Sequence, residues 1–171
     1  VIDRNQFDTF YHEHPRTYSV KSFRSVAEQL GMHIEHLSFP KRYGGNIRVI
    51  LGSDRAMQSL EPFQSAEKGY LEKFKDMAAF VEKWKVEKRA EIEALNAQHG
   101  ALTAKAFPGR AAILIKLLNL DVSHIKRISE KPGSMKIGHY APGTRIPIVS
   151  DNEISYDQED CILNLAWHIS D

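Results

Sequence analysis

The spacing of apolar positions along the chain predicts its first elements. Apolar residues recur at helical steps up to Leu30, which predicts a helix. Either Ser19 or Ser22 can cap its start. Partial alternation over 32–39 and a run of branched apolar residues over 46–51 predict two strands. A glycine-containing turn joins these strands, so we expect an antiparallel pair preceded by one helix.

A second pattern fills the middle of the chain. Apolar positions recur at steps of three and four with Lys and Glu between them, which predicts one amphipathic helix from about Ser65 to Gln98. It would be about 50 Å long. Its core positions keep no strict heptad, which disfavours a coiled coil and favours a bridge between two bodies. The apolar stripe expected to be buried comprises Tyr70, Phe74, Met77, Val81 and Trp84.

The last third predicts strand, turn, helix and strand in succession. This order is typical of a βαβ unit and indicates a parallel α/β layer. A Gly- and Pro-rich loop over 131–145 and a short apolar run over 146–149 precede the last strand. The predicted elements are a strand at 101–106, a helix at 110–119, a strand at 124–129 and the last strand at 161–167.

Composition narrows the class of protein. The 171 residues make one domain or two small bodies joined by a helix, and their formal charge of +1 gives no support to a nucleic-acid or membrane partner. The single Cys161 excludes a disulfide framework within the chain and favours a cytoplasmic setting. The longest apolar stretch, 111–120, is too short to span a bilayer. The chain begins at Val1 and stops just after an apolar run, so we expect a piece of a longer protein.

Four consecutive hydrogen-bonding side chains, Tyr11-His12-Glu13-His14, form the strongest candidate for chemistry. A histidine moves protons near neutral pH, and a neighbouring carboxylate can orient it. The segment therefore predicts a general base with a carboxylate and a phenol beside it. The alternative is a solvated loop before the first helix. The His-Glu-His spacing does not match a helical zinc motif, and we predict no metal here.

A turn and two basic residues are weaker candidates. Pro108, Gly109 and Arg110 lie between a predicted strand and helix, where backbone N–H groups attract anions and Arg110 adds charge. Lys136 and Arg145 flank the Gly- and Pro-rich loop and could also reach phosphates. An ordinary turn and solvated side chains are the alternatives.

Several motifs in order resemble the second half of the S-adenosylmethionine-dependent sugar C-methyltransferases, which act on nucleotide-linked ketosugars. They are Phe7–His14, Gly31-Met32, Tyr43–Val49, the Lys136–Ile148 stretch with Pro-Gly-Thr and Ile-Pro-Ile, and Leu163–His168. Together they cover essentially the whole chain.

The resemblance implies three parts in the complete protein: a zinc-binding segment with cysteines, a methyltransferase domain and a Rossmann-like C-terminal domain. This sequence lacks the cysteines and the glycine-rich loop that binds S-adenosylmethionine. Residues 1–55 would then end the methyltransferase domain, 56–98 would bridge, and 99–171 would form a truncated α/β C-terminal domain. The cofactor would be bound mainly by the upstream part, as would the zinc.

The resemblance also implies roles. His14 would remove a proton α to the sugar ketone, with Tyr11 and Glu13 supporting it, and the turn at 108–111 would lie near the diphosphate. Only Gly109 remains here of the family's commoner Gly-x-Gly-Ala turn. The alternative function is a non-catalytic module that binds a nucleotide-sugar or a partner. The sugar, the nucleotide, the methylated carbon and the oligomeric state stay open.

Overall fold

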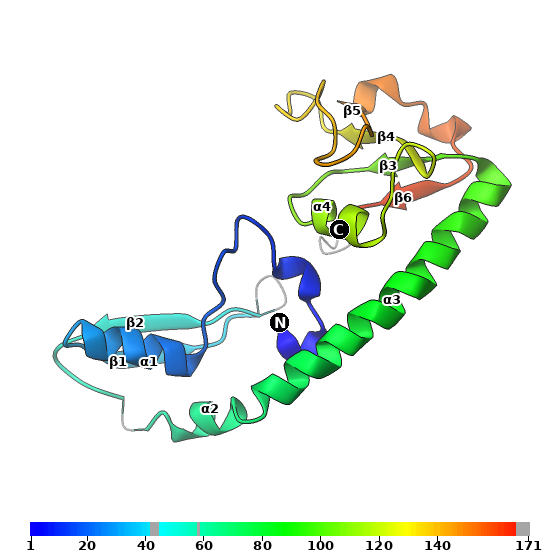
Figure 1. Cartoon of the computed structure of the whole chain (residues 1–171). Helices are drawn as coiled ribbons and strands as arrows, with labels where there is room; N and C mark the ends of the chain where they lie inside the picture. The colour runs from blue at the N-terminus through cyan, green and yellow to red at the C-terminus, as the bar shows by residue number, and fades with distance from the viewer. Residues whose placement is uncertain (42–44, 58, 167–171) are drawn as a thin grey trace. The chain divides into compact units, whose positions relative to one another are not determined.

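The computed structural model describes residues 1–41, 45–57 and 59–166 (Figure 1). The chain divides into two compact units. The N-terminal unit comprises Val1–Phe7 and His14–Ala78, and the C-terminal unit comprises Asp8–Glu13 and Ala79–Asp171. The short segment Asp8–Glu13 therefore belongs with the C-terminal unit although its chain neighbours on both sides do not.

The N-terminal unit is a helix packed on a two-stranded hairpin. Its elements are η1 (Ile2–Arg4), α1 (Val20–Gln29), β1 (His33–Ser38), β2 (Arg48–Gly52) and α2 (Glu61–Ala66). The strands are antiparallel, as predicted, and the helix covers the face that carries Ile34 and Leu37. The register shifts at Glu35, so these two residues, three apart, share one face. The predicted turn over 40–45 lies partly outside the described residues, which resume at Gly45.

Helix α1 begins where the sequence predicts. Ser19 caps it through a bond from the Ser22 backbone N–H, and the Ser22 side chain returns a bond to Ser19. Glu67 adds a second cap from further along the chain, because its carboxylate accepts the backbone N–H groups of Val20 and Lys21. A carboxylate at this end also complements the helix dipole.

The prediction of one helix from Ser65 to Gln98 is wrong at its start. The structure ends α2 at Ala66 and begins α3 (Tyr70–His99) after Gly69, whose φ is +82°. That left-handed conformation suits glycine and interrupts the helix. The intervening Glu67 is the residue that caps α1, so a long-range contact accompanies the break. Periodicity continues across it and cannot reveal it.

Burial along α3 also differs from the prediction. Met77 is buried and Trp84 packs against the core of the C-terminal unit, as expected, but Phe74 is 38% exposed. Ile92, further along, is the other buried residue of the helix. Which residues of α3 are buried therefore depends on the contacts within each unit, and the buried residues do not form one continuous stripe. The helix has 30 residues and is about 45 Å long.

The C-terminal unit is a four-stranded parallel sheet in the order β5-β4-β3-β6, which confirms the predicted α/β class and gives a Rossmann-like layer. Its elements are η2 (Phe7–Thr9), whose first residue belongs to the N-terminal unit, β3 (Leu102–Lys105), α4 (Ala111–Leu117), β4 (Ile125–Glu130), β5 (Ile148–Ser150), η4 (Asp151–Glu153), η5 (Tyr156–Gln158) and β6 (Ile162–Asn164). The predicted last strand, 161–167, extends to Trp167, which lies outside the described residues.

The two faces of this sheet are covered differently. Helix α4 packs Ala111 and Ile115 on one face, against Ala104, Ile125 and Ile128. The opposite face carries the buried Thr103 and Ser129, and the connection from β5 to β6 lies over it, with Tyr156 bonded to Ser129. The chain adds β4 and β5 on one side of β3 and then returns to add β6 on the other. In open α/β sheets such a reversal marks the ligand-binding crevice, at the carboxyl ends of the strands.

None of the helices within the described ranges combines the length and the apolar character that crossing a bilayer requires.

Candidate functional site

The Tyr11–Glu13 segment lies directly against the turn between β3 and α4, at the carboxyl end of β3. A Cβ added at Gly109 would lie 2.8 Å from Glu13 Oε1 and 3.0 Å from Tyr11 Cε2. A side chain at position 109 would therefore displace Glu13 or Tyr11. The structure brings two of the three predicted catalytic residues, Tyr11 and Glu13, to Gly109 of the predicted substrate-binding turn.

An ion pair holds the chain three residues before this segment. Arg110 Nη1 lies 3.2 Å from Asp8 Oδ2, and the two side chains are only 14% and 11% exposed. A buried charge is costly without a partner, so each side chain requires the other. The sequence analysis predicted Arg110 as a phosphate ligand and did not single out Asp8. The separation of 102 positions explains why no local pattern could reveal the pair.

The phenol and the carboxylate of the segment are bonded to each other. Tyr11 Oη donates to Glu13 Oε2 at 3.0 Å. Burial and this hydrogen bond raise the pKa of Tyr11 above its ordinary value of 10. Tyr11 therefore stays protonated at neutral pH and acts as a donor rather than a base.

The two histidines of the segment are both exposed. The ring of His12 meets the ring of Tyr11 edge-on, with centroids 5.5 Å apart, and His12 Nε2 lies 3.9 Å from Glu13 Oε1. His14 is the first residue of the second segment of the N-terminal unit.

Lys136 lies at the same edge of the sheet and crosslinks two loops. Its Nζ donates to the Phe107 backbone carbonyl at 2.6 Å and lies 3.2 Å from Glu130 Oε2, at the end of β4. Arg145 does not lie at this edge. It precedes the parallel strand β5 by three residues, so it belongs to the side where the strands begin.

A polar cluster that the sequence analysis did not predict lies under the connection from β5 to β6. The Tyr156 hydroxyl donates to Asp151 Oδ1 at 2.5 Å and accepts from the buried Ser129 Oγ at 2.5 Å. The bond from Tyr156 lowers the pKa of Asp151, and burial raises that of Tyr156. Lys105 Nζ lies 4.8 Å from the Tyr156 ring centroid. No alternation in β4 marks Ser129, since its chain neighbours are Ile128 and the charged Glu130.

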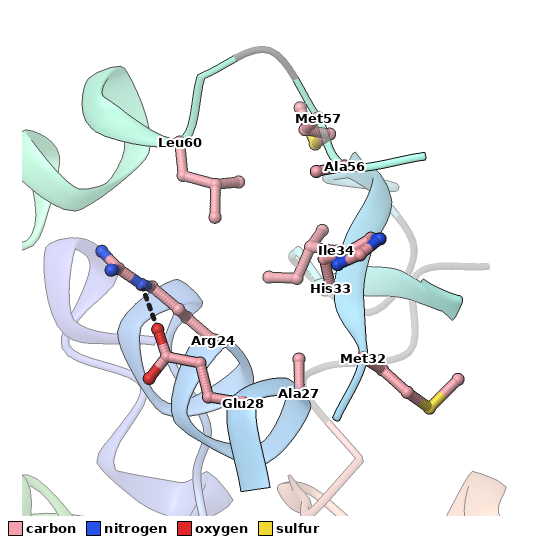
Figure 2. Close-up of a pocket in the computed structure, with 9 residues that line it drawn as sticks. All are labelled: Arg24, Ala27, Glu28, Met32, His33, Ile34, Ala56, Met57 and Leu60. Atoms are coloured by element: carbon pink, nitrogen blue, oxygen red, sulfur yellow. Dashed lines mark hydrogen bonds and ion pairs between the residues drawn. The ribbon is translucent and has the colours of Figure 1, made fainter. Parts of the chain in front are cut away.

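A small hollow in the N-terminal unit lies between α1, β1 and the segment before α2 (Figure 2). Its volume of about 130 Å³ is well below the roughly 300–1,000 Å³ of typical small-molecule sites. Figure 2 shows Ile34 and Leu60 turned into it, with Arg24 and Glu28 bonded to each other at its rim. We interpret it as a packing gap beside a small core.

Within the described residues, neither a glycine-rich turn after β3 nor a cluster of metal-binding side chains is found. The only glycine in the turn after β3 is Gly109, and Tyr11 and Glu13 cover it, so this turn provides no glycine-rich cradle for S-adenosylmethionine. No group of three or more His, Cys, Asp or Glu that could hold a metal ion occurs in the part of the chain that the structure describes.

Comparison with known proteins places residues 41–171 in a family. Residues 41–171 match the family described as C-methyltransferase C-terminal domain. The chain is similar to C-methyltransferase NovU of Streptomyces niveus, with 24% identity over 176 aligned residues that cover 98% of this chain. It spans 42% of the length of that relative.

Proposed function

The chain belongs to the C-methyltransferase C-terminal domain family, and from this membership we propose that it forms part of an S-adenosylmethionine-dependent enzyme that methylates a carbon of a nucleotide-linked ketosugar. The single observation that carries the proposal is the contact of Tyr11 and Glu13 with Gly109. It brings Tyr11 and Glu13, which precede the proposed base in the chain, to the sheet edge where an α/β layer binds ligands.

In this proposal His14 is the general base. It takes the proton from the carbon α to the sugar ketone and leaves an enolate whose carbon is nucleophilic. Tyr11 is unsuited to that role because its raised pKa keeps its proton in place. Tyr11 instead donates to Glu13, and that bond orders the residue next to His14.

The nucleotide-sugar would lie at the carboxyl edge of β3 and β6, with its diphosphate near the turn that contains Pro108 and Gly109. Lys136 holds this turn to the end of β4 through the Phe107 carbonyl and adds positive charge beside it. S-adenosylmethionine, when bound, supplies the methyl group. In this proposal residues outside this chain bind S-adenosylmethionine, and other residues outside it bind the expected zinc.

The test replaces His14 by Asn or Ala in the full-length protein. Because positioned proton transfer contributes about 10²–10⁴-fold to a rate, we expect kcat to fall at least about a hundredfold. The KM values for both substrates should change little, since the side chain acts in the transition state. Exchange of solvent deuterium into the carbon α to the ketone reports proton removal without methyl transfer and should fall equally.

His12→Asn is the matched control, because it removes an exposed imidazole two residues away. It should retain most of the kcat and the deuterium exchange. Undiminished exchange in the His14 variants would exclude His14 as the base. Binding of nucleotide-sugar by a wild-type protein that shows neither exchange nor methylation would favour the non-catalytic binding module.

A further inference from the structure

We propose that Asp8 and Arg110 form a positioning pair through which the C-terminal unit holds the Tyr11–Glu13 segment in its catalytic conformation. The inference rests on the proposed function and gives Arg110 a role other than direct contact with phosphate. Its basis is the geometry of the ion pair and of the neighbouring Gly109.

The pair is built as an internal tie. Asp8 is 8% exposed and belongs to the short helix η2, three residues before Tyr11. Arg110 follows Gly109 directly and precedes α4, whose buried Ala111 and Ile115 fix it to the sheet. A guanidinium only 14% exposed and already paired with a carboxylate is poorly available to a diphosphate.

Gly109 provides the second contact. Tyr11 and Glu13 lie where a Cβ at this position would be, so the backbone of the turn forms a surface that fits them. The ion pair holds Asp8, three residues before the segment, and the close contact holds Tyr11 and Glu13 themselves. His14, the proposed base, follows Glu13 immediately. Its backbone position therefore depends on how the Asp8–Arg110 pair holds the preceding residues.

A misplacement of about 1 Å in a reacting group can reduce a rate by about a hundredfold. Loss of either charge should therefore affect turnover far more than substrate binding. A direct phosphate ligand would show the opposite pattern, with a raised KM for the nucleotide-sugar and a response confined to Arg110.

The experiment uses Asp8→Asn, Arg110→Ala and the charge swap Asp8→Arg with Arg110→Asp in the full-length protein. Chymotrypsin cleavage after Phe10 and Tyr11 under native conditions measures the hold on the segment without any substrate. We expect each single variant to be cleaved at least about tenfold faster and to lose at least about tenfold in kcat, with the KM for nucleotide-sugar within about threefold. The swap should restore both cleavage resistance and kcat to within about threefold of wild type.

Lys116→Ala is the control, because Lys116 is an exposed basic residue on α4. It should match wild type in both measurements. If Arg110→Ala loses its circular dichroism signal, Asp8→Asn carries the test, since it keeps the shape of the side chain.

Three results would overturn the proposal. The first is unchanged cleavage in the folded single variants. The second is faster cleavage with an unaltered kcat, and the third is a swap that remains as sensitive as the single variants. A wild-type protein that has no methyltransferase activity would remove the proposed function, and the cleavage results would then show the ion pair as a structural contact only.

Discussion

The two units differ in the number of apolar residues that they bury. In the N-terminal unit the buried apolar cluster comprises Val20 and Ala27 of α1 and Ile34 and Leu37 of the hairpin. The C-terminal unit gathers 13 buried residues around a sheet that is covered on both faces. The N-terminal unit leaves Leu30, Phe39 and Ile50 more than half or half exposed. The turn that contacts Tyr11 and Glu13 therefore belongs to the unit with the larger buried core.

The same register shift occurs in both units and serves each core. In β1 the extra residue is Glu35 and in β4 it is Lys126. Each shift brings two Ile or Leu residues three apart onto one face, which plain alternation forbids. In β4 it also lets the neighbouring Lys126 and Arg127 both reach Glu159. An insertion in a strand can therefore serve the core and a polar cluster together.

Truncation of one core residue in each unit should give the largest contrast. Ile128→Ala, in the C-terminal sheet, should lower the free energy of unfolding by about 3–5 kcal/mol, because the site is 0% exposed and tightly surrounded. Ile34→Ala should cost about 2–3 kcal/mol, because Ile34 already borders a hollow and its neighbours can relax. Urea-dependent hydrogen exchange, measured on peptides from each unit, separates the two values. Equal losses of unfolding free energy for the two variants would contradict the expected difference between the two cores.

Acid should weaken the C-terminal unit first. Burial by itself would raise the pKa of Glu159, but hydrogen bonds from Arg127, Lys126 and Thr103 outweigh it and lower the pKa from 4.5 to about 2. A lowered pKa stabilises the folded state above pH 4.5, and that stabilisation, about 2–3 kcal/mol, is lost as the pH falls towards 2.

The N-terminal counterpart of this group is Asp3. The hydrogen bond from Lys73 lowers its pKa too, but its side chain is 72% exposed and contributes little. Glu159→Gln should reduce the loss of stability between pH 4.5 and 2 in peptides of the C-terminal unit, where Asp151 also contributes, whereas Asp3→Asn should leave the pH profile nearly unchanged. A pH profile that Glu159→Gln does not flatten would exclude this carboxylate as its origin.

The smallest contrast concerns two arginines on helices. Arg89 donates to the carbonyls of Leu118 and Asn119, at the end of α4, and contacts His124 Nε2 at 2.7 Å. Arg89→Ala should cost about 2 kcal/mol, because two carbonyls at the end of α4, one of them part-buried, lose a charged donor. Arg24→Ala removes only the exposed pair with Glu28 and should cost about 0.5 kcal/mol or less. The same exchange measurement checks both, and similar costs would show that α3 is not tied to α4 through Arg89.

The order and type of the elements follow from the sequence. The capped helix after Ser19, the antiparallel strands and the βαβ unit all leave local signals, namely periodicity, a capping residue and turn residues. The candidate segment from Tyr11 to His14 is also visible locally, because its side-chain types and their spacing carry chemical meaning by themselves.

Tertiary contacts decided the rest. The helix break at Gly69 accompanies the cap that Glu67 places on α1, the shifts at Glu35 and Lys126 depend on the strands they face, and Arg110 is paired by a residue 102 positions away. Local patterns report the backbone preference and the polarity of each residue. They do not report which distant group neutralises a buried charge or fills the space above a glycine, because that depends on which faces meet when the chain packs.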